Sequence, residues 1–318
     1  MNRLGNHSYN DRNTHPNSNA SGISNRKARA VNTNSRAAAS GRAARSGKSN
    51  LTGFRLSLAF LILIAMASLL APLLAPYGVN EMTAAVNEAP SILHWFGTDS
   101  LGRDLWGRVL YGGRASLVIG WMAAALSAAL AVLYGTLSGL AGPRMDQALM
   151  RACDLLLSVP QILMAVFLQA ILGAASWGSL VIVIGATGWM GLARIVRNEV
   201  RKLRGSDYIT AAQMMGASSG YILRTHLLPN FIPAILYPMI SSIGSAIASE
   251  STLSFLGLGL PLDSASWGSL LSDAQRSLLS GQWWTVIFPG SVLVLTLIAI
   301  AEVGEHFRLR NTRRHSNL

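Results

Sequence analysis

Ionisable side chains are scarce in the parts of this sequence where catalysis or ion coupling would need them. Within the long apolar segments, away from their ends, one acid stands out, Glu250, because Glu302 lies at the end of the last segment. A lone carboxyl group forms neither the nucleophile-and-base pair of a hydrolase nor the relay of buried charges of an ion-driven carrier. A Gly-x-x-x-x-Gly-Lys-Ser/Thr phosphate-binding loop is also missing, so we expect the energy for any transport to come from another subunit.

The sequence gives equally little support to metal or redox chemistry. Its single cysteine, Cys153, excludes a disulfide within the chain and a cysteine-rich metal site. The six histidines are scattered over the termini and loops; they are His7, His15, His94, His226, His306 and His315. We therefore predict no catalytic residue, no metal site and no cofactor.

Composition indicates that most of the chain is surrounded by lipid. Hydrophobic residues make up 51% of the 318 residues and charged residues 13%, against about 25% charged in a soluble domain. A membrane-crossing helix needs about 20 mostly apolar residues. Six segments qualify: 54–76, 115–141, 155–174, 178–196, 232–256 and 284–303. The first is too long for a signal peptide and five more follow it, so the sequence predicts an all-α membrane protein with six transmembrane helices.

The basic residues predict how these helices are oriented. With both termini in the cytoplasm, 22 of the 26 Lys and Arg residues lie on the cytoplasmic side and four lie outside, as the positive-inside rule requires. Ten of the 22 fall in residues 1–55 beside a single acid, Asp11. We expect residues 1–53 to be a disordered basic cytoplasmic tail near anionic lipid headgroups rather than a nucleic-acid-binding arm. Residues 54–306 then form the transmembrane domain, and 307–318 a second cytoplasmic tail.

Small residues follow one face of two of the predicted helices. In the second helix they recur at every fourth position, which allows another helix backbone to approach closely; they are Ala123, Ser127, Ala131, Gly135 and Gly139. In the fifth helix Ser241, Ser245 and Ser249 form a similar stripe. Their hydroxyl groups either line a polar path or bond to the carbonyl groups of their own helix, and the sequence leaves both interpretations open.

The cytoplasmic loop at about 199–230 predicts a short helix with one apolar stripe. The stripe has the helical spacing i, i+3, i+4 and i+7 and consists of Tyr208, Ala211, Ala212 and Met215. Gly216 follows at a position where a positive φ would end the helix. A second short helix is expected to run to Pro229 and to end there. The stripe either packs against the chain's own loop or is buried in a groove of a partner protein.

Several separated motifs resemble those of one transporter family. Ala211-Ala212-x-x-x-Gly216, followed by Leu228-Pro229, resembles the cytoplasmic loop of permease subunits of bacterial ABC importers. The C-type permeases of the dipeptide, oligopeptide and nickel importers are similar over about residues 54–306. Their motifs are 94–104 (HWFGTDSLGRD), 112–117 (GGRASL), 250–259 (ESTLSFLGLG), 266–268 (SWG), Trp283-Trp284 and Pro289-Gly290. One departure is Thr210, at a position where the wider family often has glutamate.

The resemblance implies a fold, partners and a location. The fold would be that of a type I ABC importer permease in the bacterial inner membrane. The partners would be a second permease in a heterodimer, two ABC ATPase subunits and an extracytoplasmic solute-binding protein. The loop residues Tyr208, Ala211, Ala212, Met215, Gly216, Leu228 and Pro229 would couple the chain to the ATPase. Outer loops 77–113 and 257–283 would meet the binding protein.

Two functional questions stay open at this point. An ion-coupled secondary carrier or a membrane-embedded enzyme would need more polar residues within the membrane than Glu250 alone supplies, so we expect neither. The solute would be a peptide, a peptide-like compound or a metal chelate, with a nickel or metallophore importer as the alternative. For Glu250 we predict a cationic partner at the outer end, Arg114 or Arg276, and a role in an outer gate together with the path residues Ser241, Ser245 and Ser249. A helix-end acid facing water is the alternative.

Overall fold

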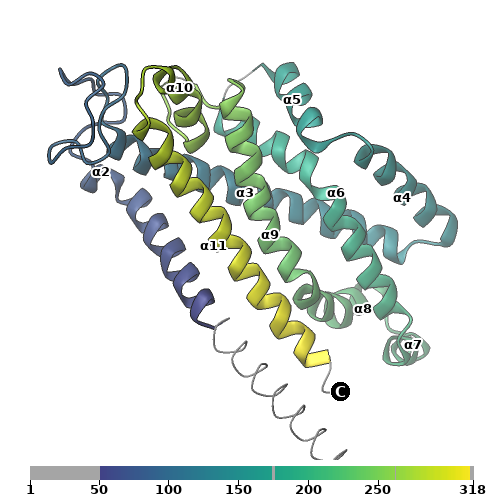
Figure 1. The fold of residues 1–318 in the computed structure, drawn as a ribbon. Helices are drawn as coiled ribbons and strands as arrows, with labels where there is room; N and C mark the ends of the chain where they lie inside the picture. The colour runs from purple at the N-terminus through teal and green to yellow at the C-terminus, as the bar shows by residue number, and fades with distance from the viewer. Residues whose placement is uncertain (1–50, 174–175, 262, 316–318) are drawn as a thin grey trace, which may run out of the picture. The chain divides into compact units, whose positions relative to one another are not determined.

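The structure is a computed structural model that describes residues 51–173, 176–261 and 263–315. Of the tail predicted at 1–53, residues 1–50 lie outside this part, and 51–53 belong to the first helix instead. Within these ranges the regular structure is helical, apart from two isolated β-bridges in the segment before α3 (Figure 1). The helices are Leu51–Leu69, α2 (Ala71–Leu74), α3 (Leu105–Leu140), α4 (Pro143–Leu157), α5 (Gln161–Leu172), α6 (Trp177–Arg204), α7 (Asp207–Met214), α8 (Ser219–Ile222), the π-helix η1 (Leu223–Leu227), α9 (Leu228–Phe255), α10 (Trp267–Leu279) and α11 (Trp284–His315).

Five helices are long and apolar enough to cross a membrane, and they match five of the six predicted segments: Leu51–Leu69, α3, α6, Gly220–Phe255 and α11. The predicted helix at 155–174 is different. It is a pair, α4 and α5, bent by 83° at a break that contains Pro160, whose ring removes a backbone donor. The predicted tail at 307–318 also differs, because α11 continues to His315.

Close contact between α3 and α6 confirms the role of the small residues. The Ser127 hydroxyl donates to the carbonyl of Gly185 at 3.0 Å. A Cβ atom at Gly135 would lie 2.5 Å from the carbonyl oxygen of Ala193, and one at Gly139 would lie 2.8 Å from Val200. Only glycine allows the two backbones to approach so closely. Residue numbers rise together along both helices, so α3 and α6 are parallel.

This parallel packing decides whether the bent pair crosses the membrane. The chain leaves α3 at Leu140 and must enter α6 at Trp177, at the opposite end of the same contact. The segment between them therefore returns across the bundle, and α4 and α5 lie along this return (Figure 1). The geometry supports six crossings, the sixth being a broken one.

The remaining contacts place both ends of the described chain at one end of the bundle. Helices α9 and α11 are antiparallel, because Gly304 lies against Tyr237 whereas Gly244 lies against Ile300. The ring of Phe54, near the start of the first helix, stacks on His306 at 4.0 Å. The start of the first helix, the 199–230 segment and the end of α11 thus share an end, and 70–104 and 256–283 form the other. An even number of crossings places both ends on the same side of the membrane, as predicted. That this side is the cytoplasm rests on the distribution of basic residues.

We predict that the two ends of the α4–α5 pair label from opposite sides of the membrane. Single cysteines at Gly142 and Gly178, in a Cys153→Ser background, suit this test because no side chain crowds either glycine. A membrane-impermeant maleimide applied to whole cells should label Gly178→Cys, and Gly142→Cys should react only after the membrane is opened. Labelling of both positions from the same side would show a re-entrant loop and reduce the crossings to five.

Candidate functional site

A fully buried carboxylate, Glu250, joins three helices near the outer end of the bundle. Its side chain accepts hydrogen bonds from Ser116 of α3 at 2.8 Å and from Ser254 of α9 at 2.7 Å. Ser251 donates at 3.4 Å, and the Ser266 hydroxyl at the start of α10 is a further neighbour. We call Glu250 and these four serines the Glu250 cluster.

The predicted pairing of Glu250 with Arg114 or Arg276 is wrong. Within the described ranges Glu250 forms no ion pair. Neutral hydroxyl groups occupy its hydrogen-bonding positions instead. The alternative of an acid facing water is also wrong, since the residue is 0% exposed. A buried acid needs such partners because an unsatisfied polar group is costly to bury.

Glycines from three sequence motifs close the protein around this cluster. A Cβ atom at Gly268 would lie 2.4 Å from the carbonyl oxygen of Ser251, and one at Gly259 would lie 2.0 Å from the Ser254 hydroxyl. The backbone N–H of Trp267 donates to the Ser116 hydroxyl at 3.2 Å. The motifs at 112–117, 250–259 and 266–268, far apart in the sequence, therefore meet at one point. Sequence reasoning named the motifs but did not anticipate that they meet.

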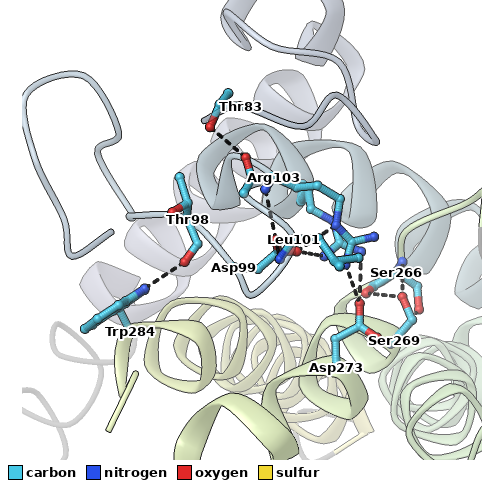
Figure 2. A network of polar contacts seen from close by, with 11 residues as sticks. Thr83, Thr98, Asp99, Leu101, Arg103, Ser266, Ser269, Asp273 and Trp284 are labelled. Atoms are coloured by element: carbon cyan, nitrogen blue, oxygen red, sulfur yellow. Dashed lines mark hydrogen bonds and ion pairs between the residues drawn. The ribbon is translucent and has the colours of Figure 1, made fainter. Parts of the chain in front are cut away.

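The motif at 94–104 forms a second polar cluster, which the sequence analysis missed (Figure 2). Asp99 accepts from Arg103 and from Arg108, each at 2.7 Å. Both arginines also reach Asp273 of α10, at 3.2 and 3.1 Å. The loop before α3 is thus tied by charge to α10, next to the Glu250 cluster. One signal in the sequence could have indicated this cluster: Arg103 and Arg108, two of the four outer arginines, follow Asp99 by four and nine residues.

Trp284 fastens the same loop to the start of α11. Its indole N–H donates to the carbonyl of Thr98 at 3.1 Å, as Figure 2 also shows. Gly97 has a φ of 76°, and a Cβ atom there would lie 2.5 Å from the carbonyl oxygen of Glu88. His94, which we did not expect to bind a metal, lies 2.9 Å from a carboxylate oxygen of Asp104. Among the described residues no group of three or more His, Cys, Asp or Glu could hold a metal ion.

A polar hollow lies within the bundle, between α3, α5, α6 and α9. Its volume is about 280 Å³. Half of its lining residues are apolar or glycine, and the polar half are Ser127, Gln161, Tyr237, Ser241, Ser242 and Ser245. No charged side chain lines it. Both interpretations of the serine stripe hold in part, because Ser245 lines the hollow and also donates to the carbonyl of Ser241 at 3.3 Å. Ser249 lies one turn further along α9 and does not line it.

At the cytoplasmic end, α7 presents a divided apolar surface. Ile209 and Ala212 are buried, and Ile209 packs with Leu227 in the chain's own core. Met214 and Met215 are 84% and 82% exposed. The predicted stripe therefore needs a correction: Ala212 faces the protein interior, while Tyr208, Ala211 and Met215 remain outward beside Met214. On a helix of eight residues, the spacing of Ala212 is compatible with either the buried or the exposed face.

The turn after α7 has the predicted geometry. Gly216 has a φ of 84°, and no atom crowds the position where a side chain would begin. The predicted stop at Pro229 is wrong, because the chain passes from α8 through the π-helix η1 directly into α9. Proline is accepted there because its missing N–H falls in the first turn of α9. The extra residue of the π turn lets Leu228 donate to the carbonyl of Leu223.

The comparison with known protein families decides the identity of this membrane domain. The family described as "Binding-protein-dependent transport system inner membrane component" matches residues 131–304. The chain belongs to this family. It is therefore an inner-membrane permease component of a binding-protein-dependent transport system, and the family is not catalytic.

Individual relatives and one solved structure agree with this assignment. The dipeptide transport system permease protein DppC of Bacillus subtilis is 38% identical over 246 residues, which cover 77% of each chain. OppC, the oligopeptide transport system permease protein of the same organism, is 36% identical over 252 residues, 79% of this chain and 82% of the relative. A putative peptide permease of Brucella suis is 38% identical over 247 residues, 77% and 82% of the two chains. A chain of the inward-facing methionine ABC transporter MetNI has a TM-score of 0.53 at 16% identity, over 64% of this chain and 95% of that chain, and supports the fold.

We predict that replacing Glu250 destabilises the permease in proportion to the hydrogen bonds lost. Glu250→Ala leaves the Ser116 and Ser254 hydroxyls without their acceptor and opens a cavity, which should cost about 2–4 kcal/mol. Glu250→Gln keeps the volume and one acceptor oxygen, so its loss should be smaller. Thermal unfolding of the purified permease in detergent measures both. Equal unfolding temperatures for Glu250→Ala and the unchanged protein would show that the Glu250 cluster does not hold the helices together.

Proposed function

We propose that this permease forms, with a second permease subunit, the membrane path of an ATP-driven importer for peptides or peptide-like solutes. The observation that carries the proposal is the similarity to dipeptide and oligopeptide permeases over more than three quarters of the chain. The remaining partners would be two ATPase subunits and an extracytoplasmic solute-binding protein. A metal chelate is a second solute class, and a nickel or metallophore importer is the alternative within the family.

The polar hollow suits a peptide as the solute. Hydroxyl and amide groups can donate to and accept from the N–H and C=O groups that every peptide carries. Because no charged side chain lines the hollow, it would not select strongly among peptide side chains. We assign Ser241 and Ser245 to the translocation path. Ser249 would join them only in another conformation, and Glu250 would hold the outer end closed.

Helix α9 links this path to the cytoplasmic surface. The exposed part of α7, formed by Tyr208, Ala211, Met214 and Met215, would be buried in a groove of the ATPase, where apolar side chains leave water. Leu228 and Pro229 begin α9, which continues past the hollow to Glu250. A displacement of α7 upon ATP binding would therefore move one continuous helix that reaches the outer gate.

The ends of the chain and the outer loops complete the arrangement. Residues 1–53 and 307–318 are proposed to be cytoplasmic, with the basic first segment near anionic lipid. Loops 77–113 and 257–283 are proposed to meet the solute-binding protein. The ion pairs of Asp273 with Arg103 and Arg108 join these two loops to each other, so they would be presented as one surface.

We predict ATP-dependent uptake of small peptides by cells that carry this permease and its partner genes. Uptake of a labelled dipeptide should fall at least tenfold when the gene for this chain is deleted, and unlabelled peptides of varied side chains should compete. A matched assay with labelled nickel should show no such dependence. Nickel uptake that depends on this gene, without peptide uptake, would favour the alternative solute.

We predict that Gly216→Val uncouples ATP hydrolysis from uptake. A β-branched residue in the left-handed conformation costs about 1–2 kcal/mol, and the chain can relieve the cost by reorienting α7. Uptake per ATP should fall several-fold at an unchanged amount of permease in the membrane. Gly216→Asn is the matched control, because asparagine adopts this conformation more readily.

The exposed residues of α7 allow a second, independent test of its contact with the ATPase. Met215→Asp should weaken ATPase binding, because it places a charge in the proposed contact. A charged residue at Ala212 would not test this contact, since Ala212 is buried in the permease itself and the substitution would disturb its folding. If Gly216→Val and Met215→Asp both match the unchanged protein in uptake per ATP and in ATPase association, α7 is not the coupling element.

A further inference from the structure

A large apolar groove lies along one side of the first helix, between it and part of the transmembrane domain. Its volume is about 640 Å³, within the range of small-molecule sites. The first helix, α3, α9 and α11 form its walls. Most of its lining is aliphatic: Leu61, Ala65 and Leu117 are examples from two of the walls.

One side of the first helix lines this groove and has no neighbouring helix packed against it in the described chain. Six of its residues line the groove at helical spacing and thus form one face: Leu58, Leu61, Ile62, Ala65, Ser68 and Leu69. Only 6% of its apolar window is buried, against 44% for α3 and 56% for α6. The side of the first helix that lines the groove is therefore largely uncovered by protein, whereas Ile64, on the neighbouring side, packs against buried residues of α9, α10 and α11. From Leu58 to Leu69 the groove-lining side is about 16 Å long.

One end of the groove carries polar groups without partners. Arg114 lines the groove and is exposed, and within the described ranges it forms no hydrogen bond or ion pair. Ser68, which is 2% exposed, has a hydroxyl oxygen with no hydrogen-bond partner. The two lie at the same level, because the Ser68 hydroxyl would be 2.3 Å from a Cβ atom at Gly113, the residue before Arg114. This is the end at which the first helix finishes, the outer end in the charge-based orientation.

We propose that the groove binds one phospholipid of the outer leaflet. An acyl chain would fill the apolar part, and the phosphate would accept hydrogen bonds from the Arg114 guanidinium and the Ser68 hydroxyl. An arginine within a lipid-facing surface is costly unless it pairs with an anion or reaches the headgroups. The lipid would therefore satisfy the cation and serve as the packing surface between the first helix and α3. The two polar groups at the end of the groove and the length of the groove match a lipid better than a second apolar helix. Such a helix would leave Arg114 unpaired.

Photo-crosslinking in membranes tests this without any transport measurement, so the result is independent of the proposed solute. A benzophenone amino acid at Ile62 lies in the groove, and one at Ile298, on an exposed part of α11 outside the groove lining, reports on bulk lipid. In cells labelled with [³²P]phosphate, irradiation should attach phospholipid at both positions. Arg114→Gln should reduce labelling at Ile62 at least fivefold and leave labelling at Ile298 unchanged.

Matched variants separate binding from folding. Arg276→Gln removes another outer cation that does not line the groove, and should not change labelling at Ile62. Arg114→Lys keeps the charge and should retain most of the label, whereas Ala65→Trp fills the groove and should abolish it at normal permease levels. Labelling at Ile62 that is insensitive to Arg114→Gln and Ala65→Trp would overturn the proposal. Crosslinking at Ile62 to a polypeptide would overturn it also, and would make the groove a docking site for a partner helix.

Discussion

The parallel contact between α3 and α6 is the constraint on which the rest of this structure depends. Two helices consecutive in a bundle are normally antiparallel, because a short loop joins them. Here Gly135 and Gly139 bring the backbones together in the parallel sense, so the chain needs a complete return crossing between them. The bent pair α4–α5 supplies it. Without this return, the end of α6 and the start of the first helix would lie on opposite sides of the membrane.

Both ends of the bundle contain buried ion pairs, but the surface of α7 is built differently from them. At the outer end, glycines and buried polar groups lock the loops: Gly268 against Ser251, and Arg108 between Asp99 and Asp273. Buried charges and hydroxyls of this kind specify one geometry, because a partly broken network leaves costly unpaired groups. At the cytoplasmic end, buried Asp146 likewise pairs with Arg197 and Arg201 of α6. The surface of α7 differs, because Met214 and Met215 stand in solvent. Methionine is flexible and adapts to an irregular surface, which is suitable for a contact that forms and changes.

The sequence predicted what depends on composition and local spacing. Five long helices, the small-residue face of α3 and the left-handed turn at Gly216 all follow from apolar length, fourfold spacing and the freedom of glycine. It failed where partners come from distant segments. The hydroxyl groups around Glu250 come from α3, α9 and α10, and no local pattern distinguishes Ser116 from other serines. The burial of Ala212 was missed for a similar reason, since on an eight-residue helix periodicity alone does not say which face meets the core.

The prolines of α9 remove backbone hydrogen bonds from this helix close to the polar hollow. Pro238 has no N–H and cannot donate to the carbonyl of Ala234, and Pro233 leaves the carbonyl of Pro229 without its usual donor. Within a membrane such backbone groups are tolerated only where protein or a water-filled cavity satisfies them. Pro238 itself lines the hollow together with Tyr237 and Ser241. The helix that would connect the ATPase surface to the outer gate therefore lacks a backbone hydrogen bond close to the hollow, and this is the point at which α9 would bend most easily.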